Sequence, residues 1–245
     1  MDRSPGRRRS PLPARATGGI IRANNLPSHP TGVFPIARSD DAYRYDRNPN
    51  PIRPQNILLT LPAEPLPVPT PSCVPMGMIG FALSGTAIYN AVDARGRDAP
   101  AYEMQDNCAG HPQQWGQYHY HDRSPCLEDL RSQDGGHSDL VGYALDGFGV
   151  YGIHGEGGTM LTTADLDDCH GHDHTVLWDG EPRSIYHYHM TDEYPYTIGC
   201  FRGTPVQARA QLHGVPPQQG GIRLRLGPPG PPPGAPLGQH PPPRY

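Results

Sequence analysis

Gly142-Tyr143-Ala144-Leu145-Asp146-Gly147-Phe148-Gly149-Val150-Tyr151 is the stretch that decides the fold, because apolar residues run into Asp-Gly and then into apolar residues again. Asp-Gly between two such runs is typical of a β-hairpin with a two-residue primed turn, which needs positive φ at its centre. Gly80 to Tyr89 matches this stretch position by position, with Ser84-Gly85 in place of Asp-Gly. The sequence therefore predicts two similar hairpins.

Three further landmarks follow each hairpin in the same order: a Cys-x-Gly-His turn, a Tyr-His-Tyr-His segment and a closing cysteine. They are Cys108 to His111, Tyr118 to His121 and Cys126 in the first copy, and Cys169 to His172, Tyr186 to His189 and Cys200 in the second. We interpret this order as an internal duplication, with repeat one over about residues 73–126 and repeat two over about 137–200.

The fold class that these patterns predict is mainly β with long loops. Tyrosine favours strands, and the Tyr-His alternation has the period of two that a strand requires. The duplicated hairpin and strand units are each small, so we expect them to form one domain.

Composition sets the boundaries of that domain. The chain has 245 residues, and its 32 Pro and 30 Gly gather at the two ends. We therefore predict a disordered Arg- and Pro-rich tail over residues 1–19, a domain over 20–205 and a Pro- and Gly-rich tail over 206–245.

Charge excludes several partners. The net charge is -4, which argues against nucleic acid or an anionic membrane surface. No lysine occurs in the sequence, which removes Schiff-base chemistry and the lysine of a phosphate-binding loop. No run approaches the roughly 18 apolar residues of a transmembrane segment. The sequence indicates no particular protein or small-molecule partner.

The histidines are the candidate metal ligands. In a strand, residues two apart project from one face, so His119 and His121 form one pair and His187 and His189 another. A third ligand for each pair is available from the Cys-x-Gly-His turn, where glycine would permit the tight backbone that aims the histidine inward. The predicted metal ligands are His111, His119, His121, His172, His187 and His189, with His137 and His154 as a second tier.

Imidazole ligands suit transition metals, and zinc or copper is the predicted ion. Asp106, Asp167 and Asp168 precede the Cys-x-Gly-His turns and are predicted to orient the ligating histidines. One shared site and two separate sites both fit the sequence. Three readings compete: a metal-binding domain, a metal-dependent hydrolase or oxidoreductase, and an interaction module in which His and Tyr form a polar face without metal.

Five cysteines leave at least one unpaired. Thiolate ligation by Cys108 and Cys169 is one possibility. Their matched partners Cys126 and Cys200 favour disulfides instead, with Cys73 as the odd thiol. Disulfides indicate an oxidising compartment, so we expect an extracytoplasmic protein (secreted, periplasmic or at the cell surface), although no signal peptide is visible.

These motifs resemble those of the YHYH-domain proteins of bacteria and some eukaryotes. The resemblance spans about residues 20 to 205 and rests on the following segments: His29 to Pro35, Gly80 to Tyr89, Cys108 to His111, Tyr118 to His121, His137 to Gly152 and Tyr186 to Cys200. It implies an exported or surface protein, often with a lipoprotein or secretory leader, and it implies no reaction, substrate or ligand.

Overall fold

The computed structural model describes residues 19–130, 136–178, 180–208 and 210–211. This part of the chain is mainly β, which confirms the predicted fold class. The predicted tails over 1–19 and 206–245 lie largely outside the described residues. The described fold continues past residue 205, because β13 (Ala210–Gln211) pairs with β2 (Asn56–Leu61).

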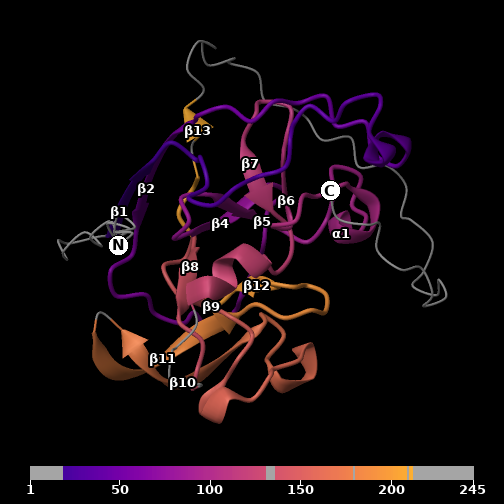
Figure 1. Ribbon diagram of the computed structural model, residues 1–245. Helices are drawn as coiled ribbons and strands as arrows, with labels where there is room; N and C mark the ends of the chain where they lie inside the picture. Colours follow the sequence, from indigo (N-terminus) through magenta and orange to yellow (C-terminus); the bar gives the residue numbers. More distant parts are fainter. Residues whose placement is uncertain (1–18, 131–135, 179, 209, 212–245) are drawn as a thin grey trace, which may run out of the picture.

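An eight-stranded sheet forms the centre of the molecule (Figure 1). Its strands, in spatial order, are β10 (Gly171–Trp178), β11 (Glu181–His189), β9 (Gly149–Tyr151), β8 (Leu140–Ala144), β4 (Met78–Ala82), β5 (Ala87–Tyr89), β7 (Tyr118–Tyr120) and β6 (Gly110–Pro112). In each half, a hairpin is followed by a parallel pairing, β5 with β7 and β9 with β11, and then by an antiparallel outer strand. The two halves thus share one strand order, while their common origin by duplication stays a prediction.

Strands β4 and β8 form the seam between the halves. They pair antiparallel, with Phe81 opposite Tyr143 at the middle of the register. Gly142 is needed there because a Cβ atom at this position would lie 2.7 Å from the carbonyl oxygen of Phe81. The outer strands β6 and β10, which carry the Cys-x-Gly-His histidines, therefore lie at opposite edges of the sheet (Figure 1).

The hairpin turns differ from the predicted primed type. Only the glycines, Gly85 and Gly147, have positive φ, which is 92° in both. Each glycine N–H donates to the carbonyl three residues earlier, Ala82 or Ala144, and the N–H of that alanine donates to the carbonyl of the residue after the glycine. This is the three-residue loop with a glycine bulge, and the polar residue before the glycine keeps negative φ.

The smaller elements surround the sheet. β1 (Gly19–Ala23) joins β2 and β13 in a three-stranded sheet, and β3 (Ser72–Cys73) pairs with β12 (Cys200–Phe201). The helical pieces are short: α1 (Ala99–Tyr102) and the 3-10 turns η1 (Asp41–Arg44), η2 (Pro125–Leu130), η3 (Glu156–Gly158) and η4 (Thr163–Asp165). Within the described residues, no helix has the length and apolar character needed to cross a membrane.

Both faces of the Tyr-His-Tyr-His segments are buried. All four tyrosines are buried in one large apolar cluster with Ile79, Phe148 and Phe201. The four histidines between them are at most 3% exposed. Burial of both faces is unusual for a strand that alternates with a polar residue, so these histidines need partners inside the protein.

Candidate metal centres

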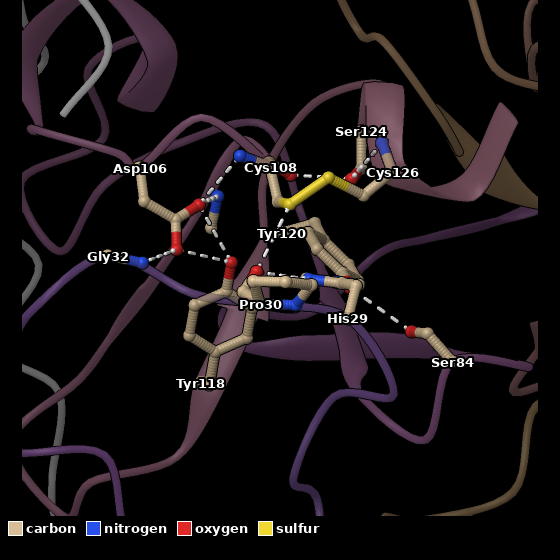
Figure 2. The surroundings of a disulfide bond; sticks show 11 residues. His29, Pro30, Gly32, Ser84, Asp106, Cys108, Tyr118, Tyr120, Ser124 and Cys126 are labelled. Atoms are coloured by element: carbon tan, nitrogen blue, oxygen red, sulfur yellow. Dashed lines mark hydrogen bonds between the residues drawn. A yellow bond between two sulfur atoms is a disulfide. The ribbon is translucent and has the colours of Figure 1, made fainter. Parts of the chain in front are cut away.

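Each Cys-x-Gly-His turn is built around one aspartate. Asp106 accepts hydrogen bonds from the backbone N–H groups of Cys108 (2.9 Å) and Gly110 (3.2 Å) and from the Tyr118 hydroxyl (2.8 Å), as Figure 2 shows for its surroundings. Asp167 has the same role in the second turn, where it accepts from Tyr186 at 2.9 Å. These two carboxylates bind the backbone of the turn and a tyrosine hydroxyl, whereas we predicted that they orient a histidine. Asp168, the third predicted carboxylate, is exposed.

The two predicted disulfides close these turns and are confirmed. Cys108 bonds Cys126, and Cys169 bonds Cys200. Cys73 is the free thiol and is exposed, as expected. Both sulfurs beside His29 are therefore engaged in a disulfide and do not offer thiolate ligands, although His29, Cys108 and Cys126 lie close together (Figure 2).

Glycine in the turn has a steric role. The residue in the left-handed region is Ala109 (φ 59°) or His170 (φ 73°), not the glycine that follows it. A Cβ atom at Gly110 would lie 2.3 Å from the Tyr118 ring, and one at Gly171 would lie 2.4 Å from the His187 carbonyl oxygen. The turn thus needs glycine so that the neighbouring strand can pass close by, and our conformational explanation was wrong.

We expect Gly110→Ala to destabilise the protein by about 1–3 kcal/mol, because the added methyl group pushes Tyr118 away from Asp106. Denaturant unfolding with the disulfides intact measures this change. Gly19→Ala is the control, because a Cβ atom there meets no other atom within 4 Å. Equal stability of the two variants would show that the strands separate freely at this point.

The first cluster contains the three histidines predicted for repeat one. His111 on β6 lies directly opposite His119 on β7, and His121 follows directly after the end of that strand. The three side chains are buried, and one ring nitrogen from each lies within 4.8 Å of the others. The Nε2 atoms of His119 and His121 are only 3.0 Å apart.

The tautomers of these histidines follow from their outer hydrogen bonds. Nδ1 of His119 lies 3.1 Å from the Gln117 carbonyl oxygen, and Nδ1 of His121 lies 2.6 Å from the Asn90 carbonyl oxygen. A carbonyl oxygen only accepts hydrogen bonds, so both Nδ1 atoms carry a hydrogen. In the neutral form of each ring, Nε2 then carries a lone pair. Two lone pairs that face each other at 3.0 Å repel unless a cation lies between them.

His111 and His119 do not readily bind a proton. Burial, followed by the charge of His121, lowers the pKa of His111 to about 4. Burial, followed by the neighbouring histidines, holds the pKa of His119 well below its usual 6.5. At neutral pH the rings of His111 and His119 are therefore neutral. The cluster brings three imidazoles together, and Nδ1 of each faces a backbone carbonyl oxygen, which for His111 is that of Met104.

The second cluster joins the three predicted histidines of repeat two with His137. His172 on β10 lies opposite His187 on β11, His189 follows on β11, and His137 approaches from the segment before β8. One ring nitrogen from each lies within 4.8 Å of all the others. Nε2 of His137 is 3.3 Å from Nε2 of His187, and both Nδ1 atoms face carbonyl oxygens, so the same repulsion arises here.

The second cluster also contains buried ring nitrogens that have no hydrogen-bond partner. Nε2 of His189 and of His172 are buried without a hydrogen-bond partner, while Nδ1 of His189 faces the Gly152 carbonyl at 2.6 Å. Burial lowers the pKa of His187 to about 3, and the pKa values of His137, His172 and His189 are lowered for the same first cause. Buried, neutral imidazole nitrogens without partners are what a metal ion would satisfy.

Two histidines near this cluster lie outside it. His154, which we placed with His137, interacts through its backbone with Ser138. His174, which we did not predict, stacks on His137 with ring centroids 5.7 Å apart, and its Nε2 lies 3.1 Å from Glu156. His172 and His174 are two apart on β10, so strand alternation was the signal for His174.

Glu103 is the other residue that the sequence patterns missed. Its Oε2 lies 3.5 Å from Nε2 of His111 and 3.4 Å from Nε2 of His121. It has no counterpart in repeat two, so the comparison of copies offered no signal for it.

Fold and site together define a disulfide-linked β protein with two buried clusters of convergent histidines. The family model described as YHYH protein matches residues 59–160, which confirms the predicted family resemblance over that range. The match contains the whole first cluster and His137, and it ends before the other histidines of the second. No curated protein and no solved structure matches the chain.

Proposed function

We propose that this protein binds transition-metal ions, zinc or copper, at its two histidine clusters. The observation that carries the proposal is the pairing of Nε2 lone pairs, His119 with His121 at 3.0 Å and His137 with His187 at 3.3 Å, where each ring donates its only hydrogen elsewhere. Donor atoms around an ion with bonds of about 2.1 Å lie about 3.0–3.4 Å apart in common geometries. Both spacings fall in that range.

The two clusters support two separate centres rather than one shared ion. Their strands β6 and β10 form opposite edges of the eight-stranded sheet. Each cluster supplies its own three or four nitrogen donors, which is enough for an ion of either metal.

The proposal includes an extracytoplasmic location, in which the protein would meet these ions. Two disulfides support it, since such bonds persist in oxidising compartments. The same bonds link the turns that carry His111 and His172 to Cys126 and Cys200.

We expect the untagged protein to bind two zinc ions per chain, and the double variant His119→Ala with His121→Ala to bind one. The reason is that this variant removes two of the three donors of the first cluster and leaves the second intact. Elemental analysis after dialysis against zinc, and again after copper, measures the stoichiometry.

The converse double variant, His187→Ala with His189→Ala, should likewise bind one ion. His154→Ala is the control and should bind two, because His154 lies beside the second cluster without being part of it. If either double variant kept the full wild-type metal content, these histidines would be structural. The protein would then be an interaction module of histidine and tyrosine.

A further inference from the structure

Glu103 is held over the first cluster by the end of α1. Its backbone N–H donates to the Ala99 carbonyl and so ends the helix. Its side chain is 29% exposed, whereas the side chains of His111 and His121 beside it are at most 5% exposed. Glu103 is therefore closer to solvent than the two imidazoles beside it.

The distances fit coordination. The carboxylate oxygen lies 3.5 and 3.4 Å from two Nε2 atoms, at or just beyond the upper end of the spacing between donors on one ion with bonds of about 2.1 Å.

The second cluster lacks an equivalent carboxylate among its donors. Its fourth donor is the imidazole of His137. Glu156 lies near this cluster, but it is 82% exposed and contacts His174, which is not one of the four donors. The two clusters consequently differ: Glu103 approaches two of the three convergent imidazoles of the first, whereas four imidazoles converge in the second.

We infer that Glu103 is the fourth ligand of the first centre and makes it accept manganese(II), whereas the all-imidazole second centre does not hold this ion. The inference rests on the proposed metal binding. Manganese(II) binds nitrogen donors most weakly of the divalent first-row ions and prefers carboxylate oxygen, so a single anionic oxygen decides whether it is retained. Zinc and copper bind imidazole well enough to occupy both centres.

The test is a titration of the metal-free, untagged protein with manganese(II) alone, in which the electron paramagnetic resonance signal of the free ion reports what remains unbound. We expect one manganese ion per wild-type chain. Glu103→Gln should weaken that binding by roughly tenfold or more while the chain still takes up two zinc ions, because glutamine keeps the shape and loses the charge. Glu156→Gln is the matched control and should bind manganese like the wild type.

Further variants keep the test decisive if Glu103→Gln does not fold. The double variant of His187 and His189 should still bind one manganese ion, and that of His119 and His121 should bind none. Unchanged manganese affinity in Glu103→Gln, or loss of manganese with the second cluster instead of the first, would overturn the role of Glu103. A wild-type chain that takes up neither zinc nor copper would instead contradict the proposed function itself.

Discussion

The metal-free protein is expected to lose several kcal/mol of stability between pH 6.5 and pH 4. Burial lowers the pKa of His111 to about 4 and that of His187 to about 3, against 6.5 in an exposed ring. Within that interval the unfolded chain binds protons that the folded chain refuses, so stability falls as the pH falls. Each such histidine contributes about 1.4 kcal/mol per pH unit, which is about 3 kcal/mol for His111 alone.

Denaturant unfolding of the metal-free protein at several pH values measures this loss. The slope of stability against pH gives the number of protons taken up on unfolding. Well above pH 6.5, His111 and His187 should contribute no slope, because they are neutral in both the folded and the unfolded state. Replacing His119 and His121 by Gln should reduce the slope below pH 6.5. Constant stability between pH 6.5 and 4.5 would mean that the clusters open to water in solution.

Removal of Asp146 should destabilise the protein by about 3–5 kcal/mol. Asp146 is 1% exposed and accepts from the Tyr188 hydroxyl (2.6 Å) and from the Gly203 N–H (2.8 Å). The Asp146→Ala variant leaves both donors buried without an acceptor. Burial raises the pKa of Asp146 and also that of Tyr188.

The equivalent position in the first half provides the matched control for this prediction. Ser84 lies 3.1 Å from the Tyr120 hydroxyl, which also bonds Nε2 of His29 at 2.5 Å. We therefore expect Ser84→Ala to cost only about 1 kcal/mol, because Tyr120 keeps its histidine partner. Chemical denaturation of both variants tests the difference, and equal losses would contradict the role given to Asp146.

Strand alternation and the comparison of copies predicted most of the two clusters. Because His119 and His121 project from one strand face, their meeting required no knowledge of the fold, and His111 followed from its place in the repeated turn. The disulfides followed from the same matched positions. Long-range contacts were different. Glu103 reaches the first cluster from a separate loop, and His137 reaches the second from before β8, so neither position could be read from local periodicity.

Two predictions failed for local physical reasons. Asp106 precedes a tight turn whose N–H groups need an acceptor. Its carboxylate accepts these hydrogen bonds instead of one from a histidine. The hairpin loop has one residue more than a primed turn, because a glycine bulge places the polar residue outside the left-handed region. The parallel pairings of β5 with β7 and β9 with β11 also depend on crossover paths that short motifs do not specify.

The seam between β4 and β8 makes the two clusters thermodynamically dependent on each other. If either half unfolded alone, the remaining seam strand would become a free sheet edge with unpaired N–H and C=O groups and with Phe81 or Tyr143 beside them. Partial unfolding is costly for that reason, and the sheet opens as one unit. Any ligand that binds the folded state at one edge then shifts the folding equilibrium for the whole sheet. Such a ligand therefore protects the distant cluster from unfolding as well, without any contact between the two clusters.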